Sequence, residues 1–367
     1  MKATARLHEV GQSLWLDNIT RTMLADGTLA GYIEELSVTG LTSNPTIFDK
    51  AISGGDAYDD QIAAVAPAAD AGEGIGANAD ERVFFELAVQ DLQGATDLFA
   101  ETHRRTAGVD GFCSLEVSPL LADDAETTIA QAAQVHAKAE RENLFIKIPG
   151  TVAGHEAIEE TIYAGVPVNV TLLFDDKHYV GAAEAYLRGI ERRIEAGLDP
   201  NVGSVASVFI SRWDVAVAKE VPAELKDRLG IAIGGRTYRA YRELLDSDRM
   251  QRLMNEGARP QRLLWASTGT KDPGASDTLY IEALASPFTV NTMPEPTLQA
   301  FADHGQVGDL VPADGGSCEA VLKEFEGAGI DVATLAARLQ EEGKVSFVKS
   351  WEDLLASIAS QRGVAAG

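Results

Sequence analysis

Eight short apolar runs alternate along this 367-residue chain with longer stretches of helical periodicity. Each run is bounded by Gly, Pro, Asn or Asp, and several are apolar on both alternating faces, as in Asn-Leu-Phe-Ile-Lys-Ile-Pro. That pattern is typical of parallel strands covered by helices on both sides. We therefore predict eight strands, at residues 13–17, 37–41, 111–117, 143–148, 166–174, 204–210, 262–267 and 288–292.

Helical patterns with acidic first turns lie between these runs. We expect helices from residue 80 onward, over 123–142 and 177–195, and from residue 214. Strands and helices alternate over more than the roughly 250 residues that a (β/α)₈ barrel needs. The pattern predicts an α/β fold of this kind, a closed (β/α)₈ TIM barrel, with an open doubly wound sheet as the alternative.

Two segments exceed what such a barrel requires. Residues 45–110 lie between the second and third predicted strands, and residues 296–367 follow the eighth. Neither is set off by a repeat or a Pro-rich linker, so we expect a single domain over 1–367 with extra helices in both places. The Ala- and Gly-rich stretch 65–78 is expected to be a mobile loop.

The composition excludes several classes of protein. The chain has 31 basic and 56 acidic residues and a formal charge of −25, which would repel nucleic acid. Two cysteines, Cys113 and Cys318, cannot form a disulfide framework and are typical of a reducing compartment. No apolar stretch is long enough for a membrane span, and no signal core begins the chain. We expect a soluble cytoplasmic protein that binds neither nucleic acid nor membrane, with monomer and homodimer both open.

The sequence lacks the common short motifs for phosphate binding, a catalytic serine and a zinc site. It has no phosphate loop, no Gly-x-Ser-x-Gly elbow and no His-Glu-x-x-His motif. The six histidines are spread singly, so no metal site is predicted.

Polar residues close most of the predicted strands, where the chemistry of a (β/α)₈ barrel is found. They comprise two carboxylates, a lysine, an arginine and several hydroxyl or amide groups. We expect them to converge at one barrel mouth: Asp17, Asn44, Glu116, Lys147, Asn169, Thr171, Ser207, Arg212 and Ser267.

Lys147 lies inside the apolar run Leu-Phe-Ile-Lys-Ile-Pro. Desolvation there favours the neutral amine, which is a nucleophile. Attack on a ketone gives an iminium that draws electrons from an adjacent C–C bond, the Schiff-base route to aldol cleavage. The alternative is a lysine whose charged end extends into solvent from the end of a strand.

Asp17 and Glu116 fit the two proton transfers that this chemistry needs, namely loss of water from the carbinolamine and removal of a hydroxyl proton. Each could instead cap a helix or pair with Lys147. Asn44 and Asn169 fit as amide contacts to sugar hydroxyls, or as turn residues. Thr171 could hold the transferred water, or serve only as a β-branched strand residue.

Ser207, Arg212 and Ser267 suggest an anion site, since the later strands of this architecture commonly hold phosphate. Arg212 could instead be a surface arginine paired with Asp214 or Glu220. Lys271 follows shortly after Ser267 and would add a second positive charge.

Four segments together resemble the transaldolase family, in the form without a fused isomerase domain. They read GLTSNPTIF at 40–48, LFIKIPGT at 144–151, PVNVTLLF at 167–174 and WASTGTKDP at 265–273. The resemblance implies Schiff-base transfer of a dihydroxyacetone unit from sedoheptulose 7-phosphate or fructose 6-phosphate to glyceraldehyde 3-phosphate or erythrose 4-phosphate. This reaction belongs to the non-oxidative pentose phosphate pathway, and it needs no cofactor.

By motif match, the resemblance implies that Lys147 forms the Schiff base, that Asp17 takes the C4 hydroxyl proton, and that Glu116 works through a water held also by Thr171. Asn44 and Asn169 would contact the dihydroxyacetone moiety. The phosphate would lie against Ser207, Arg212 and Ser267, with Lys271 in place of an arginine that many relatives carry after this serine.

Two other functions remain open from the sequence. A class I fructose 6-phosphate-type aldolase would use the same lysine, although Phe209 and Glu116 favour the transferase, because the related aldolases tend to have tyrosine and glutamine there. A catalytically silent sugar-phosphate-binding barrel is the third possibility.

Overall fold

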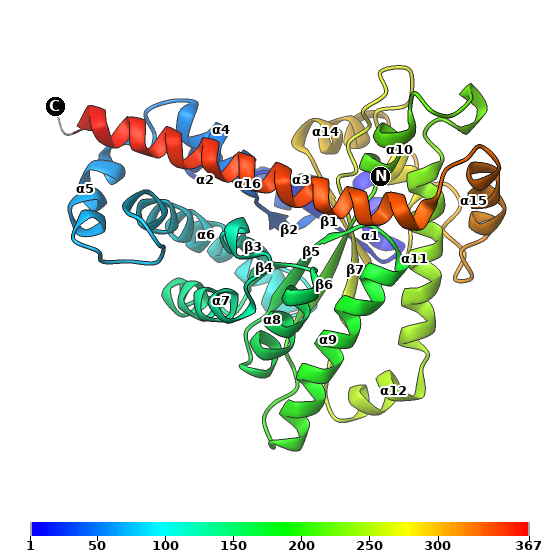
Figure 1. Ribbon diagram of the computed structural model, residues 1–367, viewed down its shortest axis with the longest axis horizontal. Helices are drawn as coiled ribbons and strands as arrows, with labels where there is room; N and C mark the ends of the chain where they lie inside the picture. Colours follow the sequence, from blue (N-terminus) through cyan, green and yellow to red (C-terminus); the bar gives the residue numbers. More distant parts are fainter. Residues whose placement is uncertain (1, 366–367) are drawn as a thin grey trace.

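A closed barrel of eight parallel strands forms the centre of the computed structural model, which describes residues 2–365 (Figure 1). The strands pair in chain order, and β1 closes the ring by pairing with β8. The predicted (β/α)₈ barrel is thereby confirmed, and the open doubly wound sheet is wrong. The strands are β1 Gln12–Asp17, β2 Val38–Thr42, β3 Cys113–Glu116, β4 Leu144–Pro149, β5 Val168–Leu173, β6 Ser204–Phe209, β7 Arg262–Ala266 and β8 Thr289–Met293.

Helices surround the barrel and connect its strands (Figure 1). Side chains of Asn78, Asp124 and Asp175 accept hydrogen bonds from first-turn N–H groups. These bonds fix the starts of α6 (Ala79–Arg105), α7 (Ala125–Ala139) and α9 (Asp176–Glu195). Among residues 2–365, no helix is both long and apolar enough to cross a membrane. Outside the two longer segments, the helices are α1 Ala3–Glu9, α2 Arg21–Ala25, α3 Thr28–Leu36, α7 Ala125–Ala139, α8 Val152–Tyr163, α9 Asp176–Glu195, α10 Ser211–Val217, α11 Leu229–Leu245, α12 Asp248–Asn255 and α13 Leu279–Ala283, with single 3₁₀ turns at Pro119–Leu121 and Ala223–Leu225.

The segment between β2 and β3 folds into α4 Pro45–Ser53, α5 Asp59–Asp70 and α6 Ala79–Arg105. The loop expected over 65–78 is wrong in its first part, because α5 continues through Asp70. Alanine is the strongest helix former, and its repetition here carries the helix past Pro67. The chain becomes irregular only where Gly72, Gly74 and Gly76 adopt positive φ angles of 90°, 113° and 127°.

The C-terminal segment comprises α14 Glu295–His304, α15 Cys318–Gly327 and the long helix α16 Val332–Ala365. Figure 1 shows α16, in orange to red, running across the molecule from α15 to α5. It packs on α4, α5 and α6 and contacts β5 and the turn at 119–121. Trp351 is buried against Phe84 with ring centroids 4.9 Å apart, and the Gln340 amide donates to the Leu172 carbonyl at 3.0 Å. This helix therefore joins the β2–β3 segment to the carboxyl ends of the strands.

Large aromatic side chains fill the barrel interior on the amino-terminal side of the polar strand ends. The Phe112 and Phe145 rings stack at 4.0 Å, and Trp15 lies 6.0 Å from Phe145. Gly40 on the neighbouring strand makes room for the indole, because a Cβ at this position would lie 2.5 Å from the Trp15 ring and 2.7 Å from the Phe112 carbonyl oxygen. The glycine of the 40–48 motif thus serves packing.

Replacing Gly40 by alanine is expected to lower the free energy of unfolding by about 1–3 kcal/mol, the usual cost of overpacking a filled core. Urea denaturation of both proteins measures the change. Gly31→Ala is the matched control, because Gly31 lies inside α3 with nothing within 4 Å of an added Cβ. That control is expected to be stabilised by about 0.5–1 kcal/mol. Equal stability changes in the two variants would contradict the packing role of Gly40.

Candidate active site at the barrel mouth

Neighbouring strands bring the predicted chemical groups together at their carboxyl ends. Glu116 pairs in register with Lys147, and Lys147 with Asn169. Asp17 is the last residue of β1, in register with Thr42. Thr171 pairs with Pro149, two residues beyond Lys147. Parallel pairing therefore converts a scattered sequence pattern into one cluster.

Lys147 and Glu116 form a buried ion pair. Lys147 Nζ lies 3.2 Å from Glu116 Oε2 and also donates to the Ser43 carbonyl oxygen at 3.2 Å. The two side chains are only 7% and 3% exposed. The Phe347 ring of α16 lies 5.6 Å from the ammonium nitrogen, so this helix covers the pair. The alternative of a lysine extending into solvent is excluded by this burial.

Glu116 is a buried carboxyl group with one oxygen left unpaired among the described residues. Burial raises the pKa of its carboxyl group, and the positive charge of Lys147 opposes that shift. Its Oε1 is buried and has no hydrogen-bond partner among the described residues, and the same holds for Thr171 Oγ1. Buried polar atoms are nearly always hydrogen-bonded, so both oxygens can serve a water molecule or a substrate hydroxyl.

Asp17 has a different environment. Thr42 Oγ1 donates to its Oδ1 at 2.7 Å and lies 2.6 Å from Thr292 Oγ1. The residue keeps partial exposure to the mouth, although its carboxyl group is closely surrounded by protein. Burial raises its pKa, while the charges of Lys147 and Lys271 and the Thr42 hydrogen bond lower it. Asp17 thus lies within the field of Lys147 without being its ion-pair partner.

The two asparagines differ in what holds them. Asn169 donates to Ser114 Oγ at 3.0 Å and accepts from Ser207 Oγ at 2.7 Å, so its amide is fixed between three strands. Asn44 accepts from the backbone N–H of Ile47 at 3.1 Å and caps α4, so it is a helix cap and not the turn residue of the alternative. Its amide nitrogen donates no hydrogen bond within residues 2–365, and can therefore contact a ligand.

Arg212, Ser267 and Lys271 line a hollow of about 560 Å³ beside the mouth, together with Ser211, Leu339 and Glu342. The Ser211 and Ser267 hydroxyls lie 2.9 Å apart. Burial lowers the pKa of Arg212, and the charge of Glu342 opposes that shift. Two cations and two hydroxyls suit an anionic group such as phosphate. We refer to these six residues as the anion hollow.

Two expectations about this region change. Ser207 was placed with the phosphate group, but its hydroxyl is committed to Asn169 and it does not line the anion hollow. Ser211 lies beside Ser267 instead. The surface pairing of Arg212 with Asp214 is also excluded, because the Asp214 carboxylate accepts from the N–H groups of Leu229 and Gly230 at the start of α11.

Sequence reasoning missed the residues that act through the backbone or come from distant elements. Ser43 contributes only its carbonyl oxygen, which no residue type encodes. Phe347 and Glu342 come from α16, and their positions over the mouth depend on how this helix packs. Thr42 ends β2, and its hydroxyl was a signal that could have identified it, whereas Ser114 lies inside β3.

Comparison with known proteins identifies the family to which this chain belongs. A family model described as transaldolase/fructose-6-phosphate aldolase matches residues 14–358. The chain belongs to this family. It is 43% identical to a transaldolase of Saccharopolyspora erythraea over 362 residues, which cover 97% of this chain and 96% of that protein. It is 42% identical to transaldolases of Thermobifida fusca over 366 residues and of Mycobacterium tuberculosis over 361 residues. These alignments cover 97% and 96% of this chain, and 97% and 95% of the two relatives.

Family membership agrees with the resemblance in the four sequence motifs. The segment 144–151 contains the buried Lys147, and 40–48 contains both Asn44 and the carbonyl that contacts Lys147. The segment 265–273 contains Ser267 and Lys271, which line the anion hollow together with Arg212. The motifs that carry the family resemblance therefore meet around one mouth.

Proposed function

We propose that this chain is a transaldolase that moves a three-carbon dihydroxyacetone unit between sugar phosphates. The donor would be sedoheptulose 7-phosphate or fructose 6-phosphate, and the acceptor glyceraldehyde 3-phosphate or erythrose 4-phosphate. The observation that carries this proposal is the buried Lys147, held 3.2 Å from Glu116 at the barrel mouth. Relatives named transaldolase at 42–43% identity support it.

The reaction begins when Lys147 passes a proton to Glu116. The neutral amine then adds to the C2 carbonyl of the ketose: a C–N bond forms, the C=O π bond breaks, and a proton moves from nitrogen to oxygen to give a carbinolamine. Glu116 protonates the departing hydroxyl through a water that Thr171 also holds, and water leaves to give the iminium. Both residues have a buried oxygen with no partner inside the protein, which fits this role.

Cleavage of the C3–C4 bond follows. Asp17 takes the proton of the C4 hydroxyl, the C4–O bond becomes a carbonyl, and the bond electrons move into the iminium to form an enamine. The shortened aldose phosphate then leaves. The enamine attacks the aldehyde of the acceptor in the reverse sense, and hydrolysis releases the new ketose and the lysine.

A transferase must keep water away from the enamine until the acceptor arrives. Lys147 is 7% exposed, and Phe347 of α16 lies over it. This cover favours transfer over release of dihydroxyacetone to water. A class I fructose 6-phosphate-type aldolase, the second activity in the family description, is the alternative.

Product analysis distinguishes the two activities. The enzyme is incubated with fructose 6-phosphate, with and without erythrose 4-phosphate, and sedoheptulose 7-phosphate and free dihydroxyacetone are quantified. The proposal requires transfer to be much faster than release of dihydroxyacetone. Equal release with and without acceptor would establish the aldolase instead.

We also place this reaction in the cytoplasm. Cys113 and Cys318 are both buried free thiols, a state that a reducing compartment maintains.

Arg212→Gln is expected to raise KM for fructose 6-phosphate by about 10- to 100-fold, because one charge-assisted contact to the phosphate is lost. The kcat value should change less, since Arg212 lies away from the reacting carbons. Steady-state kinetics with fructose 6-phosphate and with unphosphorylated fructose measure the effect. If the variant loses the same factor with both sugars, the phosphate role is wrong.

A further inference from the structure

A second hollow lies at the opposite end of the barrel from Lys147. Its volume is about 580 Å³, within the range of small-molecule sites. Its inner wall is formed by Phe112, Phe145 and Val205, at or near the amino ends of their strands. We call it the base hollow. The amino-terminal face of this architecture is not its catalytic face, so the family reaction does not account for this hollow.

The rim of the base hollow is unusually apolar for a surface. Phe288 is 61% exposed, Val109 53% and Met254 42%, and all three line the hollow. Single exposed apolar side chains need no explanation, but a group around one cavity marks a binding site.

Phe288 is held in place against its backbone preference. Its φ is 64°, in the left-handed region that bulky residues avoid. Its N–H donates to the Gly11 carbonyl and its carbonyl accepts from the Tyr241 hydroxyl, both at 2.8 Å. These bonds fix an exposed aromatic ring at the edge of a cavity, and such strain is typical of functional sites.

Several arginines line the base hollow, although the formal net charge of the chain is −25. Arg242, Arg259 and Arg262 line it, against the carboxylates of Asp110 and the exposed Asp246. The Asp110 carboxylate already has partners within the protein. Arg262 Nη1 lies 3.8 Å from its Oδ2, and the Trp15 indole N–H donates to its Oδ1 at 2.8 Å.

Arg242 and Arg259 lack a direct ion-pair partner among the described residues, although the charge of Asp246 acts on Arg242 and that of Asp199 on Arg259. Neither forms a salt bridge to any residue within 2–365, and Arg242 Nε is buried with no hydrogen-bond partner there. The Arg242 guanidinium lies 5.8 Å from the centre of the Phe288 ring. Burial lowers the pKa of Arg259, and the charges of Tyr186 and Asp199 oppose that shift.

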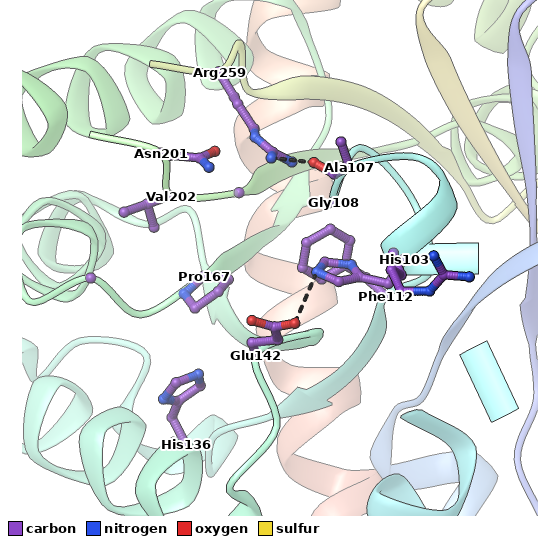
Figure 2. Close-up of a pocket in the computed structure, with 13 residues that line it drawn as sticks. His103, Ala107, Gly108, Phe112, His136, Glu142, Pro167, Asn201, Val202 and Arg259 are labelled. Carbon is purple, nitrogen blue, oxygen red and sulfur yellow. Dashed lines mark hydrogen bonds and ion pairs between the residues drawn. The ribbon is translucent and has the colours of Figure 1, made fainter. Parts of the chain in front are cut away.

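Arg259 lines both the base hollow and a smaller, more polar hollow lined by His103, Glu142 and Asn201. Figure 2 shows the smaller hollow. The Arg259 guanidinium reaches across to the Ala107 carbonyl. Gly108 permits this approach, because a Cβ there would lie 2.7 Å from Arg259 Nη1. The cation is thus held at the junction of an apolar and a polar cavity.

We propose that the base hollow binds a small amphipathic anion, a single carboxylate or sulfonate on an apolar body. The anionic group pairs with Arg242 and Arg259, and the apolar body lies against Phe112, Phe145 and Val205. Charge complementarity selects this occupant over a neutral one. The proposal is independent of the transaldolase activity, because the two sites lie at opposite ends of the barrel.

Isothermal titration with decanoate tests the proposal on the full chain. One saturable site per chain is expected, and decan-1-ol should bind at least about tenfold more weakly because it lacks the charge. Arg242→Gln and Arg259→Gln should each weaken decanoate binding by about tenfold. The control Arg252→Gln, which changes an exposed arginine of α12 outside the hollow, should bind like the parent.

Sugar-phosphate turnover by each variant shows that its fold is intact. The proposal is overturned if decanoate shows no saturable binding, if decan-1-ol binds equally well, or if Arg242→Gln and Arg252→Gln behave alike. It is also overturned if ultracentrifugation shows that a second copy of the chain covers the hollow and decanoate does not compete with it.

Discussion

Replacing Lys147 by alanine is expected to lower kcat for sugar-phosphate transfer by at least about 10⁴-fold, because no other group can form the covalent intermediate. Its position supports this expectation: Nζ lies 3.2 Å from both Glu116 Oε2 and the Ser43 carbonyl oxygen. Borohydride reduction with fructose 6-phosphate should add a stable three-carbon or six-carbon label to the parent and none to the variant. Mass mapping of the labelled peptide identifies the lysine.

Lys271→Ala is the matched control, since it removes the other lysine close to Asp17 and leaves Lys147 in place. It should label like the parent once donor is saturating. Loss of Lys147 also leaves Glu116 buried without its cation, which destabilises the fold. The double variant Lys147→Ala/Glu116→Gln removes that charge and separates folding from catalysis. A label on any other residue of a folded variant would disprove the assignment.

The barrel strands were predictable because burial on both faces leaves a strong signal. Every predicted strand overlaps an observed one, and the differences are confined to the ends. The third run, 111–117, shortens to Cys113–Glu116 because Gly111 adopts a φ of 82°, outside the β region. Closure itself was inferred only from the count of strands, since the pairing of β1 with β8 joins residues nearly 280 positions apart.

The candidate site was predictable to the extent that it lies at strand ends. Asp17, Glu116 and Lys147 each follow or interrupt an apolar run, and parallel pairing brings such positions together. No sequence pattern indicated that side chains of α16 would contribute to the site. Phe347 and Glu342 belong to an ordinary amphipathic helix, and only the packing of that helix on α4, α5 and α6 places them over the mouth.

The two carboxylates illustrate how environment separates similar groups. Burial raises the pKa of both Asp17 and Glu116. Glu116 is in direct contact with Lys147, whereas Asp17 is held by the Thr42 hydroxyl and keeps access to the mouth. A carboxyl group beside the lysine amine suits the proton transfers at C2. A carboxyl group further from the amine suits removal of the C4 hydroxyl proton.

Asp17→Asn is therefore expected to stop cleavage and spare imine formation. Loss of a general base costs about 10²- to 10⁴-fold in kcat. The amide can still accept the Thr42 hydrogen bond, so the geometry should survive. Borohydride labelling of Lys147 by fructose 6-phosphate should continue at a near-parent rate, with the six-carbon adduct replacing the three-carbon one. Intact-mass spectrometry of the trapped enzyme distinguishes the two adducts.

The pH dependence gives a second readout for Asp17. As a base it works only when ionised, and its pKa is raised from the ordinary 3.8. The kcat/KM value should thus fall as pH decreases through that raised pKa, and this acid limb should be absent from the residual activity of Asp17→Asn. Glu116→Gln is the contrasting variant, because it should slow the labelling that Asp17→Asn spares. If both variants slow labelling equally, the two carboxylates do not divide the proton transfers, and Asp17 serves only to hold the ketose near Lys147.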